Sequence, residues 1–325
     1  MESIRHNRIV AIDILKVFAV LAVLNSHMEI CYDNYKYLST GGAIGDALFF
    51  FCSGFMLFRS NVLRFDNFIK KKIARIYPTV FVIALVTCLF FNNNQSIEWI
   101  LRTGGGWFVN CIMVYFALMW IIQKFFIKKL SIVSIVLAII IISTYYPFFN
   151  ADSSLSIYGN TYYKWIFFFA FMLQGAIIGM NIEKYKYTKK SLPLTLICIV
   201  AWYGILLANQ KLGLFSEYIY ISLIPLLGIT YFGYKFCCAP YWSKIYNTNI
   251  GGQILYITGN LCLECYLIQF YIFTDALNFI FPLNIPLMML IVLIVSYIIN
   301  FMTNVLLQTL QKGNYEWNKT FLMRR

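Results

Sequence analysis

Repeated apolar stretches of about 17–25 residues constrain this chain most, because each matches a helix that crosses the hydrocarbon core of a bilayer. Ten such stretches follow one another, separated by polar segments. The bilayer core contains no water to hydrogen-bond the backbone N–H and C=O groups. A spanning segment must therefore form these hydrogen bonds internally, as an α-helix does. We therefore predict an all-α fold, a polytopic transmembrane helical bundle of about ten helices.

The predicted helices cover the apolar stretches and leave the polar segments as loops. The first stretch holds Asp13 and Lys16 in its interior and lacks a small-residue cleavage site, which argues against a cleavable signal peptide. We see no soluble domain or internal repeat, so residues 1–325 are expected to form a single membrane domain. The predicted ranges are 9–28, 43–60, 76–91, 106–123, 130–146, 163–181, 191–208, 217–235, 253–274 and 285–308.

Charge supports this arrangement. Only 12% of the residues are charged, about half the share found in soluble domains, yet the net charge is +13. With ten spans, 21 Lys and Arg residues fall on the side of the two termini and four on the opposite side, while Lys16 lies within a span. The positive-inside rule then places both termini in the cytoplasm, and it explains the basic balance without a nucleic acid partner.

The cysteines do not indicate a metal site. Nine are present, mostly in apolar segments, and Cys262 and Cys265 form a CxxC pair. The chain has only two histidines, His6 and His27, and neither lies near this pair. We expect no metal and interpret the thiols as small apolar side chains.

Ionisable residues inside a span are costly and mark function or a need for a partner. In the first helix, Asp13 and Lys16 are neighbours at i,i+3. Lys16 and His27 are eleven residues apart, about 20° from full turns, so they share a face and lie about 16 Å apart along the axis. We interpret them as one polar stripe; a snorkelling Asp/Lys pair with an unrelated interfacial histidine is the alternative.

The second helix enters from the side where the first one leaves, so Asp46 is expected at a depth similar to that of His27. A carboxylate that is hydrogen-bonded to one imidazole nitrogen fixes the tautomer and makes the other nitrogen more basic, as a general base requires. Ser53 lies on the same face as Asp46, seven residues later. For Ser53-Gly54, close helix packing is at least as good an interpretation as catalysis.

A basic cluster precedes the third span. The segment after Lys70 contains Lys72, Arg75, Tyr77 and Pro78, and we place its cations in an inner loop with the proline in the first helical turn. Such cations bind phosphates, but ordinary positive-inside charge explains them equally well.

Aromatic and acidic residues complete the candidates. Trp107 and Tyr115 share a face of the fourth helix, for which an interfacial aromatic belt is the default interpretation. Glu264, followed by Tyr266, is placed in the middle of the ninth span. A carboxylate there needs a partner or a wet cavity, and a hydrogen bond between helices is the alternative to a functional role.

In this order, the pieces resemble the acyltransferase-3 family of integral-membrane acyltransferases. The resemblance extends over roughly residues 8–270. Two positions depart from the family pattern: Lys72 stands where arginine is common, and Gln269 stands where many members have a histidine. The matching residues are Lys16…His27, Gly45-Asp46…Phe49-Phe50…Ser53-Gly54-Phe55, Lys72…Arg75-Ile76-Tyr77-Pro78, Trp107-Phe108…Tyr115 and Leu263-Glu264-Cys265-Tyr266-Leu267.

The resemblance implies transfer of an acyl group, by default acetyl from acetyl-CoA, from cytoplasmic acyl-CoA to a sugar hydroxyl of a glycan or lipid-linked sugar, in the inner (plasma) membrane of a bacterial cell. Membrane lipid surrounds such a protein, and a homo-oligomer is compatible with the sequence. His27 and Asp46 are then the catalytic pair. The acyl-CoA side is assigned to Asp13, Lys16, Ser53, Lys72, Arg75 and Tyr77, and the substrate or channel to Trp107, Tyr115, Glu264 and Tyr266.

Two other functions stay open on the residues alone. A transporter or flippase for a lipid-linked sugar would also have ten spans, a polar stripe and inner basic charge. A non-catalytic partner in polysaccharide synthesis would keep the family motifs without turnover, and Gln269 keeps that alternative in play. Consumption of acyl-CoA separates acyl transfer from these two alternatives.

Overall fold

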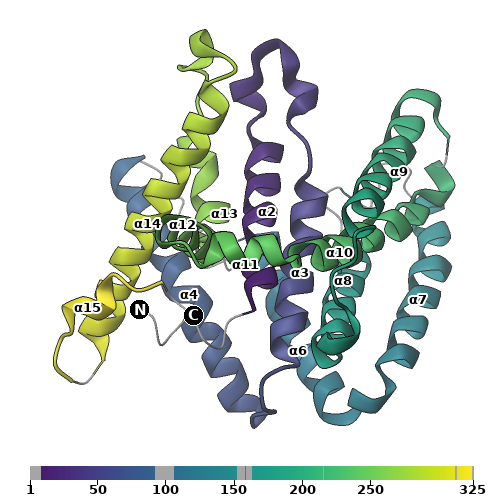
Figure 1. The fold of residues 1–325 in the computed structure, drawn as a ribbon, viewed down its shortest axis with the longest axis horizontal. Helices are drawn as coiled ribbons and strands as arrows, with labels where there is room; N and C mark the ends of the chain where they lie inside the picture. Colours follow the sequence, from purple (N-terminus) through teal and green to yellow (C-terminus); the bar gives the residue numbers. More distant parts are fainter. Residues whose placement is uncertain are drawn as a thin grey trace. The chain divides into compact units, whose positions relative to one another are not determined.

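The protein is described here from a computed structural model covering residues 9–91, 106–151, 158, 163–214, 216–311 and 313–323, in which every regular element is a helix (Figure 1). The all-α prediction is confirmed. The longer helices are α2 (Val10–His27), α3 (Gly42–Leu57), α4 (Phe65–Phe90), α6 (Trp107–Phe125), α7 (Leu130–Ala151), α8 (Tyr163–Met180), α9 (Ser191–Leu212), α10 (Leu223–Cys237), α12 (Asn249–Asn260), α13 (Cys262–Ile272) and α14 (Asn284–Leu310). The shorter ones are η1 (Glu29–Leu38), η2 (Ile127–Lys129), η3 (Ile182–Lys184), η4 (Ser216–Ser222), α11 (Pro240–Tyr246), η5 (Asn278–Ile280) and α15 (Trp317–Thr320).

Within the described residues, eight helical segments are long and apolar enough to cross a membrane, and nine if η1 and α3 form one broken span. Helices occur at all ten predicted ranges, so the polytopic bundle is confirmed. The cytoplasmic location of the termini stays a prediction. The eight segments are Val10–His27, Phe65–Phe90, Trp107–Phe125, Ile127–Tyr145, Tyr163–Met180, Ser191–Leu212, Tyr218–Cys237 and Asn284–Leu310.

The start of α4 corrects the prediction for the basic cluster. The helix begins at Phe65, so Lys72 and Arg75 lie in a helix and not in a loop, and Pro78 is inside the helix and not in its first turn. Residues 65–77 contain no glycine or proline, and lysine and arginine favour helices. Asp66 stands in the first turn, where the helix dipole favours an anion.

The ninth predicted span is also different. Instead of one helix over 253–274, α12 and α13 are separated at Leu261, whose φ of −87° and ψ of 14° leave the helical region. Gly259 and Asn260 immediately precede the break, and both residue types are weak helix formers. With 11 residues, α13 is too short to cross the core of a bilayer alone.

The chain forms two compact units, each described here by itself, and the single-domain assignment stays a prediction. Helices α2, α3 and α6 contribute residues to both units. Unit 1 contains residues up to Leu15, Asp46–Val62 and Leu118–Thr248; unit 2 contains Lys16–Gly45, Leu63–Ala117 and Asn249 to the C-terminus.

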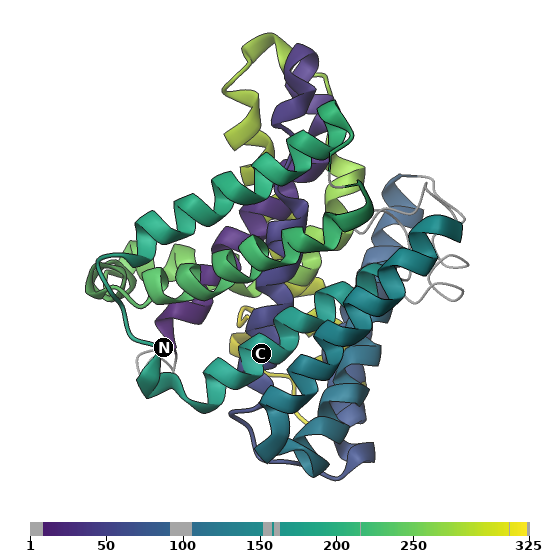
Figure 2. The ribbon, with the colours of Figure 1, turned by 90° about the vertical axis from the view of Figure 1, so that its right-hand side faces the viewer.

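Unit 1 depends on close contact between α3 and α8. A Cβ added at Gly54 would overlap the carbonyl oxygen of Met172, and one added at Gly175 would overlap that of Phe51. Small residues at such positions let two backbones approach closely. On the same unit α7 packs beside α8, and α9 packs against α10 (Figure 2).

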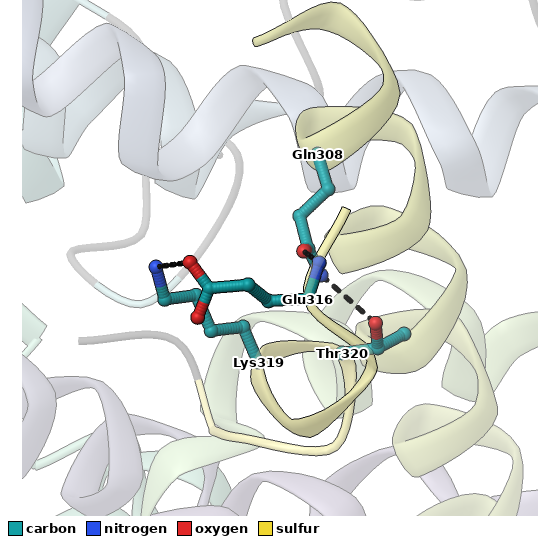
Figure 3. A network of polar contacts seen from close by, with 4 residues as sticks. All are labelled: Gln308, Glu316, Lys319 and Thr320. Carbon is teal, nitrogen blue, oxygen red and sulfur yellow. Dashed lines mark hydrogen bonds and ion pairs between the residues drawn. The ribbon is translucent and has the colours of Figure 1, made fainter. Parts of the chain in front are cut away.

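Unit 2 is built around α4, α13 and α14, which pack against one another. The C-terminal segment folds back onto the end of α14. The Asn304 Nδ2 donates to the carbonyl oxygens of Thr320 (2.9 Å) and Leu322 (2.8 Å). Gln308 completes the contact: its Nε2 donates to the Thr320 hydroxyl (2.8 Å) and its Oε1 accepts from the Glu316 backbone N–H (3.0 Å), as Figure 3 shows.

Candidate active site

His27 is the last residue of α2 and belongs to unit 2. Its ring lies edge-on against Phe270 of α13, with the ring centroids 4.7 Å apart. The His27 side chain is exposed, so a proton donor from outside α2 and α13 can reach it. Lys16 is half-buried on the same helix and in the same unit.

Asp46 lies in α3 and belongs to unit 1, so its predicted pairing with His27 joins two separate units and stays a prediction. Inside unit 1, Asp46 interacts electrostatically with Lys164. Lys164 is 5% exposed and stands in the first turn of α8. From the sequence, Lys164 is one of the four cations on the side opposite the termini. A lysine at the edge of an apolar stretch, opposite a predicted intramembrane carboxylate, is the signal that indicates such a partner.

Asp13 is also in unit 1 and is buried. Its Oδ2 accepts a hydrogen bond from the Tyr246 hydroxyl in α11 at 2.9 Å. Nothing in the spacing of Tyr246 pointed to this contact, because the two residues are 233 positions apart. Ser53 is half-buried, and the neighbouring Gly54 fills the packing role described above.

The two cations of α4 differ in their surroundings. Lys72 is half-buried, with its Nζ 4.2 Å from the ring centroid of Phe116 and 5.2 Å from that of Phe68, distances at which the ring faces attract a cation. Arg75, one turn later, is exposed and interacts electrostatically with Glu264. Tyr77 is half-buried on the same helix.

Glu264 is buried and lies in the first turn of α13, not in the middle of a span. Its Oε1 accepts a hydrogen bond of 3.4 Å from the Thr79 hydroxyl of α4. A carboxylate is favoured at a helix N-terminus by the helix dipole. Glu264 therefore links α13 to α4 through Thr79 and, electrostatically, Arg75.

Two of the aromatic candidates, Trp107 and Tyr266, contact Phe108 of α6. The Tyr266 ring lies 5.1 Å from that of Phe108, and Trp107 is edge-on to Phe108 with centroids 5.8 Å apart. Tyr115 is buried at 2% exposure two turns further along α6, so it contributes to packing inside unit 2 and not to an exposed belt.

Gln269, at the position where the family resemblance suggests a histidine, is completely buried in α13. Its Nε2 donates to the carbonyl oxygen of Tyr266 at 3.0 Å. Its Oε1 has no hydrogen-bond partner among the described residues. The side chain thus fills its position without reaching solvent.

Taken together, α13 is the element that connects the candidates of unit 2. Phe270 contacts α2 at His27, Tyr266 contacts α6, and Glu264 contacts α4 beside the basic pair. Nine of the twelve predicted site residues fall in this unit; Asp13, Asp46 and Ser53 fall in unit 1. Among the described residues, no group of three or more His, Cys, Asp or Glu side chains is arranged to hold a metal ion.

A match to a known protein family covers most of the chain. The acyltransferase-3 family model, described as an acyltransferase domain, matches residues 9–301. The comparisons with curated proteins and with solved structures found no match. The match covers α2 through most of α14 and includes every candidate residue discussed above. With its several apolar helices and this match, the chain belongs to the acyltransferase-3 family and is a multi-pass membrane acyltransferase.

Proposed function

We propose that the protein transfers an acyl group, by default acetyl, from cytoplasmic acyl-CoA to a hydroxyl of an envelope or exopolysaccharide sugar, in the inner membrane of a bacterial cell. The observation that carries the proposal is the family match combined with the position of α13, which contacts both His27 and the helix of the basic pair. A phosphate-binding group and a proton acceptor within one compact unit are what this reaction needs.

The donor is recognised by Lys72 and Arg75. Coenzyme A carries several phosphates, and paired cations on one helix face bind them by charge-assisted hydrogen bonds. Arg75 offers a planar fork that suits phosphate oxygens, while Lys72 acts as a point charge. The rings of Phe68 and Phe116 flank the Lys72 ammonium and restrict its position.

His27 acts as the general base. Its imidazole removes the proton of the acceptor hydroxyl, the hydroxyl oxygen forms a bond to the thioester carbonyl carbon, and the carbon–sulfur bond breaks. The proton then passes from His27 to the departing thiolate, which leaves as coenzyme A thiol. Asp46 is proposed to orient the imidazole, as a carboxylate partner does in other catalytic pairs.

The test is a comparison of surface-glycan masses in cells with the gene, without it, and with a His27→Ala copy. The expected result is loss of an acetyl-sized mass in both altered strains, with the variant protein present in the membrane at the normal level. Unchanged acylation together with an altered glycan amount would indicate a flippase or a non-catalytic partner, and the catalytic role of His27 would be withdrawn.

A further inference from the structure

The two chain segments that leave the contact between His27 and Phe270 join each other again. One is η1, which begins two residues after His27, and the other is the 273–283 link that follows α13. We call these two segments the cap. The Asn278 Nδ2 donates to the carbonyl oxygen of Ile30 (3.0 Å) and the Cys31 thiol donates to that of Thr274 (3.5 Å).

The cap is held in a fixed shape by amide side chains at its base. Asn25 Nδ2 donates to the carbonyl oxygens of Leu38 (2.8 Å) and Thr40 (2.9 Å), and Asn25 Oδ1 accepts from the Tyr32 hydroxyl (2.5 Å). Asn284 Nδ2 donates to the carbonyl oxygen of Cys31 at 2.7 Å. A surface segment anchored at both ends is pre-organised, which lowers the entropy cost of binding a ligand.

The exposed side of the cap presents aromatic rings. Tyr35 stacks on Phe281 with the ring planes 10° apart and the centroids 5.4 Å apart, and Tyr37 lies edge-on to Tyr35. Tyr35 is 46% exposed and Tyr37 73%. We call Tyr35, Tyr37 and Phe281 the aromatic platform. Because Phe281 stacks on one face of the Tyr35 ring, the Tyr35 ring has a defined orientation toward a flat ligand.

Polar groups surround the platform. Glu29 and Asp33 are exposed acceptors in η1, where the only cation is Lys36. Asp33 has a φ of +46°, rare outside glycine, and its Oδ2 accepts from Asn34 Nδ2 at 3.0 Å. Strained backbone at an exposed polar residue is characteristic of binding sites. In a chain of net charge +13, a segment with more carboxylates than cations disfavours anionic headgroups and suits a neutral polyol.

We propose that the aromatic platform binds a neutral saccharide, with Tyr35 stacking on the apolar face of a sugar ring and Glu29 and Asp33 accepting from its hydroxyls. Because the cap begins beside His27, this saccharide is the acceptor sugar or the sugar residue next to it. The inference therefore rests on the proposed function. The chemistry is that of small-molecule sites in general: an apolar aromatic surface with a few placed polar groups.

The experiment uses the full-length protein in nanodiscs of neutral lipid, and it compares wild type, Tyr35→Ala and Tyr35→Phe. Binding of the methyl glycosides of glucose, galactose, mannose, rhamnose and N-acetylglucosamine is measured by saturation-transfer NMR. We expect at least one glycoside to bind wild type and Tyr35→Phe equally. Tyr35→Ala should lower its affinity about tenfold, because ring stacking is lost. Tyr187→Ala, which removes an exposed tyrosine from the segment before α9, should leave binding unchanged.

Release of coenzyme A from acetyl-CoA, measured on the same samples, separates the two proposals. Glycoside binding without coenzyme A release would retain the platform and overturn the acyl transfer. Binding of no glycoside, or equal binding by Tyr35→Ala, would overturn the platform whatever the release assay shows. Unchanged glycoside binding by Tyr35→Ala, together with less phospholipid co-purifying with this variant in detergent before nanodisc assembly, would assign the rings to the bilayer interface, which also overturns the platform.

Discussion

Lys72 shows how a residue that departs from its family's usual arginine is held in place. Its ammonium lies over Phe116 and near Phe68, so its charge is fixed relative to α4 and α6. An exposed lysine on a flexible stem would lose more side-chain entropy when it binds a phosphate. The two rings therefore replace part of the rigidity that an arginine fork would supply.

Replacing Lys72 with alanine should raise KM for acyl-CoA about tenfold, with a smaller effect on kcat, because a charge-assisted phosphate contact contributes about 1.5–3 kcal/mol. Lys72→Arg should retain most of the affinity. Both are measured by coenzyme A release from purified protein in nanodiscs. Lys71→Ala removes the same charge from the adjacent exposed position and serves as the control. An equal rise in KM for Lys71→Ala would show that only the general basic field matters.

Residue patterns located many of the candidates but few of their partners. The polar stripe of Lys16 and His27 and the need of Glu264 for a partner followed from helical spacing and from the cost of intramembrane charge. The partners Lys164, which interacts electrostatically with Asp46, and Tyr246, which donates to Asp13, did not, because each is more than 100 residues away from its carboxylate. Periodicity along one helix carries no information about which other helix it faces.

Among the elements, α3 and α8 are a helix pair in unit 1 whose backbones approach closely at glycines. A Cβ added at any of three glycines would overlap a carbonyl oxygen of the partner helix. The pairs are Gly54 with Met172, Gly175 with Phe51 and Gly179 with Phe55. The sequence left packing and catalysis as alternatives for the Ser53-Gly54 pair, and the contacts favour packing for the glycine.

Gly54→Ala should lower the stability of the protein by about 2 kcal/mol or more, because overfilling a well-packed contact forces the backbones apart. Gly204→Ala is the matched control: it lies within α9 with no atom within 4 Å of the added Cβ, and it should be neutral or stabilising by up to about 1 kcal/mol. Thermal unfolding in detergent measures both. Equal melting temperatures for the two variants would contradict the close contact of α3 and α8.

Element boundaries were predicted less well where local chemistry opposed the apolar pattern. The basic residues ahead of Ile76 suggested a loop, yet they are good helix formers and α4 includes them. Between α12 and α13 the error is the reverse. The apolar run continues through Gly259 and Asn260 and suggested one helix, yet the helical backbone is interrupted there. A hydropathy pattern reports burial in lipid, and it detects neither helix propensity nor a break.

For the whole molecule, the distribution of Lys and Arg predicts that both termini are cytoplasmic. A fluorescent protein fused after the last residue should therefore be fluorescent in bacterial cells, and alkaline phosphatase fused there should be inactive. The same two reporters inserted after Lys211, on the predicted opposite side, give the reverse pattern. Active phosphatase at the C-terminus would contradict the orientation and would move the proposed acyl-CoA side to the wrong face of the membrane.

The contact between the end of α14 and the C-terminal segment has a consequence for biosynthesis. Asn300 and Asn304 are buried, and their amides donate to the carbonyl groups of Thr320 and Leu322, which the ribosome makes 16–22 residues later. Until those residues emerge, the amides lack these acceptors, which is costly for buried polar groups. A chain cut short by a premature stop codon would keep this defect permanently. The segment around Thr320 and Leu322 thus completes the polar contacts of α14, and its absence leaves unpaired buried amides that membrane quality-control proteases can recognise.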